Sequence, residues 1–505
     1  MVHTKTHSWW RFTFILTILV LVYLTQWKTA SQKPISPTAR AAACDLHSTG
    51  DATCDGTIDI TDFEVFRKEY LGESTTTDAD FDSDATITIA DFEIWRRGYF
   101  TNTIVTSAPS VTQTITAPPS PTGTVGTGNG IWISREEMKA LPISGQPGCE
   151  SGSLCSDAWN AIITSANSTG GAPDIDTYDL PHPKMVLASA IASVRLGYEP
   201  GKTAEAQKYY AKAVQGLMDV MGTEKDSTPN PDGSGGKVDG SLAIARNLPM
   251  YVIASDIIGL YPDGSAASAG TKWGNHLKYM YHQKFTFRIG DGGESLDRNL
   301  PGCASNGCAM AGGAHIALAL YFKEKTVVDK SWLQFRRYSG DSTVGEAISF
   351  SGTGQNWYHS MGSKSAINPK GATCDNGSNY PADGVIPNDQ GRGGNCPTNI
   401  NTVPGYTQYP WEGTQGAYLM AEMLRRHGYK DEKGNDPFQT NDKALMRALE
   451  YQWYLQTKFG GVWYDNSRAA WTKHLAYLRY GYRPLVYKAS GSGRNMDFTQ
   501  WTHQK

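Results

Sequence analysis

The sequence predicts a mainly α-helical protein: an (α/α) toroid preceded by a small calcium-loop module and an N-terminal hydrophobic segment. Three observations predict this fold class. From Ile131 onward, apolar residues recur at helical spacing and strand-like alternation is scarce. Small residues recur three or four apart, as at Ala311 and Ala314 or Ala188 and Ala192, which lets helices pack as closely as concentric helical arrays require. A loop rich in acids, followed by a helical pattern, occurs twice near the start of the chain.

With 505 residues, the chain is about twice the size at which a single hydrophobic core stops growing. We therefore expect several parts. The stretch 103–130 is an uncharged linker, rich in Pro, Thr, Ser and Gly, that should hold its neighbours apart. The predicted parts are a signal peptide or anchor with a short spacer (1–42), a calcium-binding module (43–102), the linker (103–130) and a large helical domain (131–505).

The hydrophobic run within residues 1–42 predicts export of the protein. Residues 12–24, FTFILTILVLVYL, are apolar except for two threonines and follow Arg11. Such a run is short for a membrane span, but tryptophans on both sides resemble an interfacial belt. A cleaved signal and a retained single-pass anchor both remain open. Either one predicts an extracytoplasmic protein, secreted or anchored at the cell surface.

The 8 cysteines each have a near neighbour, and none forms a CxxC motif of the zinc-site kind. In the oxidising environment of an exported protein, this spacing predicts local disulfides. Buried free thiols are the alternative. The predicted pairs are Cys44 with Cys54, Cys149 with Cys155, Cys303 with Cys308, and Cys374 with Cys396.

Composition excludes several classes of protein. A formal net charge of −3 argues against a dedicated nucleic-acid binder, so we expect no nucleic-acid partner. Hydrophobic residues at 39% and charged residues at 19% exclude wholesale disorder and a multi-span membrane protein. Trp 14 and Tyr 26 outnumber Phe 15, which suits sugar stacking and surface packing alike.

At an offset of 29 residues, the segment 60–70 aligns with 89–99, and oxygen side chains recur at matched places before and within each copy. These places are positions 1, 3, 5, 9 and 12 of a calcium loop, and position 7 would give a backbone carbonyl. A solvated acidic surface is the alternative. The predicted ligands are Asp51, Thr53, Asp55, Thr57, Asp59 and Asp62 in the first loop, and Asp80, Asp82, Asp84, Thr86, Thr88 and Asp91 in the second.

Position 12 is Asp in both loops, and apolar residues such as Phe63 and Phe92 follow at helical spacing. These residues resemble a type I dockerin, an EF-hand-like module that plugs into cohesin domains. The resemblance implies structural Ca²⁺ coupled to folding and a cohesin-like partner, or docking within the same chain. Two positions depart from the pattern. Thr53 replaces the usual Asn or Asp, and Ala85 stands where the first loop has Gly56; a positive φ there would cost about 1 kcal/mol.

In the large domain, apolar periodicity predicts a series of helices joined as α-hairpins. Two long Gly/Asn-rich stretches, 286–308 and 339–410, interrupt them, and loops of this length are usually functional. The predicted helices cover 184–197, 204–222, 245–260, 271–285, 309–325, 328–338, 412–428, 442–458 and 471–481.

A set of blocks in this domain resembles the bacterial alginate-lyase-like proteins of the α/α-toroid superfamily, over most of residues 131–503. The resemblance implies β-elimination at a uronic acid of an acidic polysaccharide, with no catalytic metal. The blocks are RNLPMYVIASDII (246–258), SNGCAMAGGAHIALALYF (305–322), INPKGATCDN (367–376), DGVIPNDQGRGG (383–394), YPWEGTQGAYLMAEMLRRHGY (409–429) and GRNMDFTQWTH (493–503).

β-Elimination needs a group that neutralises the C5 carboxylate, a base for the C5 proton and an acid for the departing oxygen. Asn306 matches the family's asparagine, but Gly307 follows where its lyases carry a catalytic histidine. His359, from another loop, is a candidate replacement. Asn306 could instead cap a helix.

A tyrosine beside a cation could act as both base and acid. Tyr409 is the first candidate and Tyr406 the second, with Arg392 of the preceding Gly-rich loop binding the carboxylate. Tyr409 could equally pack a helix start, and Arg392 could be structural. Three further residues are expected to bind substrate: Arg246, Asn247 and Trp411. Arg246 could instead pair with an acid such as Asp256, and His315 and His474 are expected to be packed.

Two other functions remain open. A glycoside hydrolase on the same scaffold would use carboxylates such as Asp383, Asp389 and Glu412. A surface glycan-binding or assembly protein would have kept the helical scaffold and lost the chemistry.

Overall fold

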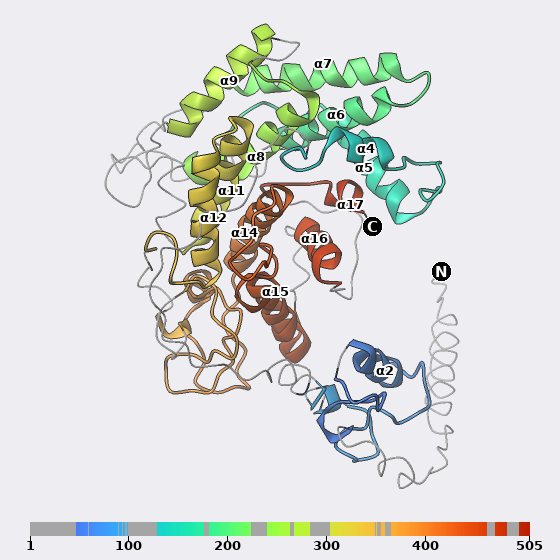
Figure 1. The fold of residues 1–505 in the computed structure, drawn as a ribbon, viewed down its shortest axis with the longest axis vertical. Coiled ribbons are helices and arrows are strands. Elements are labelled where there is room, and N and C mark those ends of the chain that lie inside the picture. Colours follow the sequence, from blue (N-terminus) through green and yellow to red (C-terminus); the bar gives the residue numbers. More distant parts are fainter. Residues whose placement is uncertain are drawn as a thin grey trace, which may run out of the picture. The chain divides into compact units, whose positions relative to one another are not determined.

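The structure is a computed structural model, and its chain divides into two compact units, Met1–Ala117 and Pro118–Lys505. It describes residues 47–58, 60–88, 90–92, 94–95, 98, 129–175, 181–223, 240–262, 267–282, 304–348, 350, 355–358, 365–461, 470–481 and 494–504. Within these ranges the chain is mainly helical, as predicted, and its extended residues form no strand longer than an isolated bridge such as that of Thr373 with Pro381 (Figure 1). No helix in these ranges is long and apolar enough to cross a membrane. The predicted export segment 1–42, most of the linker, Cys44, Asp59, Cys303 and His359 lie outside them.

The small unit has a compact aromatic core. It contains the 3-10 helix η2 (His47–Thr49) and helix α2 (Ile60–Tyr70), and its described residues 90–92, 94–95 and 98 are also helical. The ring of Phe63 lies 4.9 Å from that of Trp95, and Phe66 lies 5.8 Å from Phe92, so the helical segments of the two copies pack on one another. The duplication in the sequence is therefore a duplication in space, with one shared core.

The large unit confirms each predicted helix to within a few residues, and adds α4 and α5 at its start and the short helices α13 and α17. Its helices are α4 (Arg135–Ala140), α5 (Leu154–Asn167), α6 (His182–Gly197), α7 (Thr203–Val220), α8 (Gly240–Ile258), α9 (Ala267–His282), α11 (Asn306–Tyr321), α12 (Lys325–Ser339), α13 (Pro387–Gln390), α14 (Tyr409–Arg426), α15 (Thr440–Phe459), α16 (Ala470–Tyr480) and α17 (Thr499–Thr502). Two 3-10 helices, η3 (Gln355–Trp357) and η4 (Gly391–Gly393), lie in the long loop before α14.

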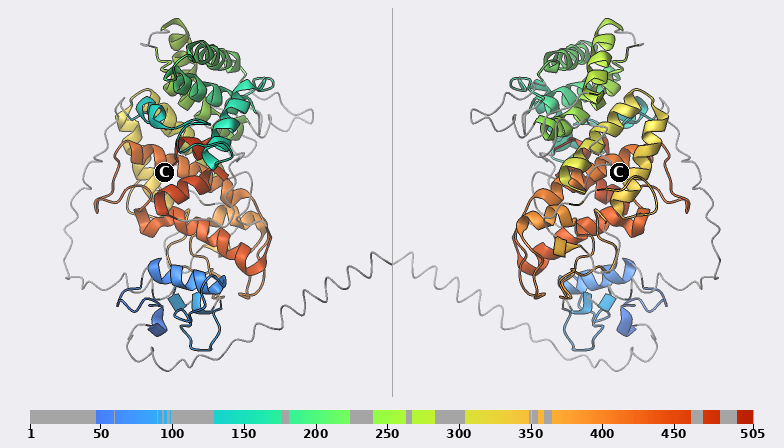
Figure 2. Two further views of the ribbon diagram at one scale, coloured as in Figure 1. Left: turned by 90° about the vertical axis from the view of Figure 1, so that its right-hand side faces the viewer. Right: turned by 90° about the vertical axis from the view of Figure 1, so that its left-hand side faces the viewer.

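These helices form an inner and an outer set. The inner helices α6, α8, α11, α14 and α16 contact one another in that order, while α7, α12 and α15 pack on α6, α11 and α14 (Figure 1; Figure 2). Burial follows the same division: α11 buries all but one of its residues, whereas α7 buries one face. An array of successive α-hairpins is the arrangement that a toroid requires, and the toroid itself stays a prediction.

Small residues permit close contact in the inner set. A Cβ atom added to Gly416 of α14 would lie 2.3 Å from the backbone carbonyl carbon of Ala309 of α11, so these two helices touch through their backbones. A Cβ on Gly313 would lie 2.8 Å from the Leu419 side chain. The packing fixes the N-terminal ends of α11 and α14 side by side, and the predicted residues Asn306 and Tyr409 begin these two helices.

The loop before α14 has its own small core around Trp357, Tyr380 and Tyr451. The disulfide Cys374–Cys396 closes this loop, and Cys149–Cys155 closes another, both as predicted. Cys54 and Cys308 are also disulfide-bonded. No cysteine among the described residues is free, which excludes the free-thiol alternative for them.

Candidate metal loops and candidate active site

The two acidic loops of the small unit repeat the same hydrogen bonds. Asp51 Oδ2 accepts the backbone N–H of Gly56 at 2.9 Å, and Asp80 Oδ2 accepts that of Ala85 at the same distance. At the far end, Asp62 Oδ1 accepts the Thr53 N–H at 2.8 Å, and Asp91 Oδ1 accepts the matching Asp82 N–H at 3.4 Å. Asp91 Oδ1 also accepts the Phe81 N–H at 2.8 Å. Both loops are thus wrapped around the carboxylates of their first and last positions.

Position 6 has the same left-handed backbone in both loops, with φ of +85° at Gly56 and +68° at Ala85. Glycine adopts this conformation without strain, whereas an L side chain costs about 1 kcal/mol or more. Ala85 therefore carries the backbone strain expected from the sequence for an alanine with a positive φ.

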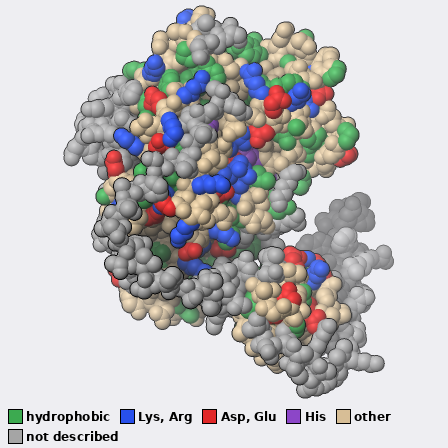
Figure 3. Space-filling model, in the orientation of Figure 1, with side chains coloured by type: hydrophobic (Ala, Val, Ile, Leu, Met, Phe, Trp, Pro, Cys, Tyr) green, Lys and Arg blue, Asp and Glu red, His purple; other side chains and the backbone are tan. Residues whose placement is uncertain are grey.

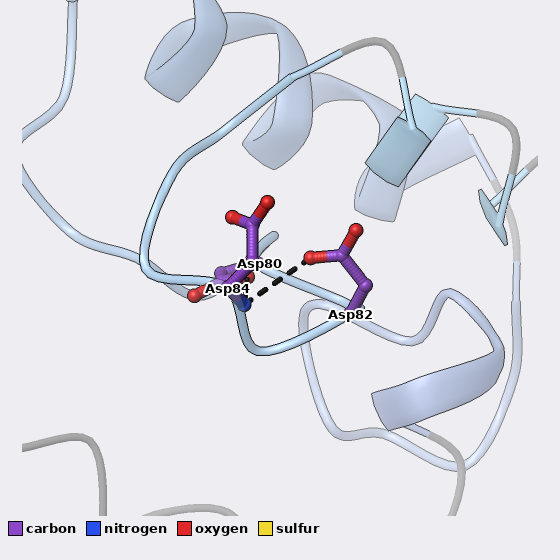
Figure 4. Close-up of side chains that lie close together, drawn as sticks. All are labelled: Asp80, Asp82 and Asp84. Atoms are coloured by element: carbon purple, nitrogen blue, oxygen red, sulfur yellow. Dashed lines mark hydrogen bonds between the residues drawn. The ribbon is translucent and has the colours of Figure 1, made fainter.

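The second loop gathers three carboxylates. One oxygen from each of Asp80, Asp82 and Asp84 lies within 4.8 Å of the others (Figure 4). Desolvation and the charges of Asp91, Asp84 and Asp80 raise the pKa of Asp82. Asp91 is fully buried close by. An all-oxygen set at this spacing fits a hard cation such as Ca²⁺, which takes six to eight oxygen ligands.

In the large unit, Glu412 lies in the first turn of α14 and is 2% exposed. Its Oε2 accepts a hydrogen bond from Arg246 Nη2 of α8 and another from Asn306 Nδ2 of α11, both at 2.6 Å. Its Oε1 accepts from the guanidinium of Arg494. Two predicted residues, Arg246 and Asn306, therefore meet at one buried carboxylate. The alternative interpretation of Arg246, pairing with an acid, is confirmed, and Glu412 is the acid.

Asp389 lies next to this cluster and is fully buried. Its Oδ1 accepts the backbone N–H of Asn306 at 3.0 Å, while its Oδ2 has no hydrogen-bond partner. A Cβ atom added to Gly413 would lie 2.8 Å from that Oδ2 and 3.3 Å from the Tyr338 hydroxyl, so the three groups surround one point. Burial raises the pKa of Asp389 to about 8, with Arg392 acting in the opposite direction. Burial therefore favours the protonated form of this side chain.

The structure brings Arg392 and Tyr409 together as predicted. The guanidinium carbon of Arg392 lies 4.1 Å from the centre of the Tyr409 ring, a cation–π contact. Arg392 is exposed and Tyr409 is half-buried, so this pair is accessible to a ligand. Tyr406, the second candidate base, is 52% exposed.

Two other predicted residues are buried, and a third is engaged in an ion pair. Trp411 is 1% exposed, and Lys473 Nζ lies 5.7 Å from the centre of its ring. Asn247 is 4% exposed and donates to the carbonyl of Ile175 at 3.0 Å. Asp383, a candidate of the hydrolase alternative, pairs with Arg447 at 2.7 Å.

Several polar residues at these helix ends were not predicted. His182 Nδ1 lies 2.8 Å from the Tyr251 hydroxyl, both buried. Arg494 comes from the closing block of the chain, and the next residue, Asn495, donates its backbone N–H to the Arg246 carbonyl at 3.0 Å. A basic residue in a block that resembles a family was the only signal for Arg494. By contrast, His315 is packed as predicted, with Nε2 3.0 Å from the Tyr281 hydroxyl.

No protein-family model, curated protein or solved structure matches this chain.

Proposed function

We propose that this protein is an exported polysaccharide lyase that cleaves a uronate-containing glycan by β-elimination and is positioned by a calcium-loaded, dockerin-like module. The observation that carries the lyase assignment is the exposed guanidinium of Arg392 stacked at 4.1 Å on the ring of Tyr409. A cation for the sugar's carboxylate and a phenol for its proton then lie side by side. Lys and Arg side chains also gather in the middle of the large unit on the face shown in Figure 3, which suits an anionic polymer.

In this reaction Arg392 binds the C5 carboxylate and disperses its charge, which acidifies the C5 proton. The Tyr409 oxygen takes that proton. The C5–H electron pair forms the C4–C5 double bond as the C4–O4 bond breaks, and the phenol returns its proton to the departing O4. The products are an unsaturated uronate and a new hydroxyl end.

Asn306 enters this proposal as a positioning residue. Its amide is committed to Glu412 and its side chain is buried, so it acts on the substrate through its neighbours. Its backbone N–H holds Asp389, which lies three residues before Arg392 in the chain. The network of Asn306, Asp389 and Glu412 would thereby fix the loop that carries the guanidinium.

The small unit would hold two Ca²⁺ ions through the oxygen side chains of its loops and the carbonyls of Thr57 and Thr86. The ion would supply the positive charge that lets these carboxylates stay close together. The partner of the module would be a cohesin-like domain or the chain itself. Export agrees with the disulfides, which persist in oxidising surroundings.

Absorbance of unsaturated uronate tests the lyase assignment. The full chain, loaded with calcium, is incubated with alginate and with polygalacturonate. We expect a rise in near-ultraviolet absorbance with wild type and a loss of about 100-fold or more with Tyr409→Phe, because the phenol oxygen is the proton carrier. Tyr279→Phe, at an exposed tyrosine of α9, is the matched control and should keep full activity. Full activity in Tyr409→Phe would exclude this site.

New reducing ends without absorbance would identify a glycoside hydrolase on the same scaffold. Binding of the polymer without any product would instead identify a glycan-binding protein.

A further inference from the structure

The loop 399–406 exposes apolar side chains to solvent. Ile400 is 46% exposed, Val403 52% and Tyr406 52%. They are three of the large hydrophobic side chains exposed in the described part of the chain, and they fall within one short loop. Scattered exposed apolar residues are ordinary, but a concentration in one loop indicates a binding surface.

Contacts along the backbone hold this loop in place. Lys458 Nζ donates to the Ile400 carbonyl at 2.7 Å, and the Tyr380 hydroxyl donates to the Thr402 carbonyl at 3.1 Å. Gln390 Nε2 donates to the Gly405 carbonyl at 3.2 Å. The loop therefore presents its side chains from a fixed backbone, which lowers the entropy cost of binding a ligand.

Two glycines place the loop against the candidate active site. A Cβ atom added to Gly405 would lie 1.6 Å from the carbonyl oxygen of Gly393, so the two backbones are in direct contact. Arg392 precedes one glycine and Tyr406 follows the other. The exposed guanidinium and the exposed phenol ring are thus each one residue from the point where the loops meet.

The charge of the segment 390–411 is one-sided. No acidic residue occurs between Asp389 and Glu412 in the sequence, and both of those acids are buried. Arg392 and Lys458 are both cations with exposed side chains. An anionic chain that lies along the loop would meet no exposed carboxylate of this segment.

We propose that loop 399–406 forms a binding subsite for an acidic saccharide, in which the Tyr406 ring stacks on the apolar face of the sugar next to the uronate whose carboxylate Arg392 binds. This inference rests on the proposed function, because it supplies the neighbouring subsite of the same reaction. Tyr406 is a binding residue here, and Tyr409 remains the proton carrier.

The test is equilibrium binding of the full chain to oligomers of mannuronate and guluronate, with dextran oligomers as the neutral probe. We expect Tyr406→Ala to weaken binding of the uronate oligomers about 5-fold to 10-fold, because aromatic stacking is lost. Tyr406→Phe should bind within about 2-fold of wild type, since the ring is kept. Tyr279→Ala removes another exposed tyrosine and should change nothing. Dextran should bind none of the proteins measurably.

The outcomes separate the subsite from the lyase. Product formation with unchanged KM and affinity in Tyr406→Ala would overturn the subsite and leave the lyase intact. Binding that depends on Tyr406, but without unsaturated product, would support the subsite and overturn the lyase. If wild type binds none of the uronate oligomers, or binds dextran equally well, the subsite for an acidic saccharide is wrong.

Discussion

The two units compensate the charge of their carboxylates in opposite ways. In the second acidic loop, no Lys or Arg of the described ranges pairs with Asp80, Asp82, Asp84 or Asp91, and their hydrogen bonds come from backbone N–H and hydroxyl groups. In the large unit, Glu412 receives two guanidinium groups.

The two units therefore differ in the source of the opposing positive charge. Like charges within a few ångströms repel, and burial strengthens that repulsion. The large unit encodes the opposing charge in its own sequence, through residues brought from α8 and the C-terminal segment. In the small unit the proposed Ca²⁺ would supply that charge, so its fold should depend on calcium and that of the large unit should not.

Removal of calcium has the largest expected effect. With excess chelator, we expect residues 47–98 to lose their protection from hydrogen exchange, because the loop carboxylates then repel without compensation. The helices of the large unit should keep theirs. Peptide-resolved hydrogen exchange by mass spectrometry measures both units in one sample. Equal protection of the small unit with and without chelator would show that its fold does not depend on calcium.

Loss of the Glu412 charge tests whether the large unit depends on the pairing of this carboxylate with its own arginines. Glu412→Gln leaves Arg246 and Arg494 buried beside a neutral group, which should lower the free energy of unfolding of the large unit by about 3 to 5 kcal/mol. Denaturant titration at saturating calcium measures the change. Glu205→Gln, at an exposed pair with Lys202, is the matched control and should change stability by at most about 1 kcal/mol. A small effect at Glu412 would mean that the network is not structural.

Asp389 represents a third solution, in which a proton neutralises the carboxylate. Its pKa rises from an ordinary value near 4 to about 8 in the folded state, so the folded protein binds a proton that the unfolded chain has released between these values. The resulting stability is full below about pH 4 and is lost as the pH rises through about 8.

Asp389→Asn should remove this pH dependence. The amide keeps the Oδ1 acceptor for the Asn306 N–H and carries no charge. Relative to wild type, the variant should therefore gain more than about 1 kcal/mol of stability between pH 5 and pH 8.5, measured by denaturant titration. Asp157→Asn, at an exposed aspartate of α5, should show a constant difference over the same range. A constant difference at Asp389 would show that burial does not hold the proton there.

Features set by residues close together in the sequence could be predicted, whereas contacts between residues far apart in the sequence could not. Long periodic segments such as α6 and α14 were predicted because their apolar pattern is local, and Cys374–Cys396 because the pairing is local. The contact of Arg392 with Tyr409 was predicted because both flank the start of α14.

The partners of Asn306 could not be found in this way. Its amide meets Glu412 across 106 residues of chain, and its backbone N–H meets Asp389 across 83. Helical periodicity gives the buried face of each helix but not the register between helices. The network was therefore visible only as separate polar residues, and Arg494 was not recognised at all.

The two acidic loops differ in backbone strain at position 6, where one has glycine and the other alanine. Ala85→Gly should stabilise the small unit by about 0.5 to 1 kcal/mol, since glycine adopts the φ of +68° without strain. The reciprocal Gly56→Ala is the matched control. An added Cβ there meets nothing within 4 Å, so only the strain of the φ of +85° acts, and we expect a loss of similar size. Hydrogen exchange of loop peptides at saturating calcium measures both changes. If Ala85→Gly destabilised the loop, the second site would depend on the alanine side chain, and the equivalence of the two loops would end at this position.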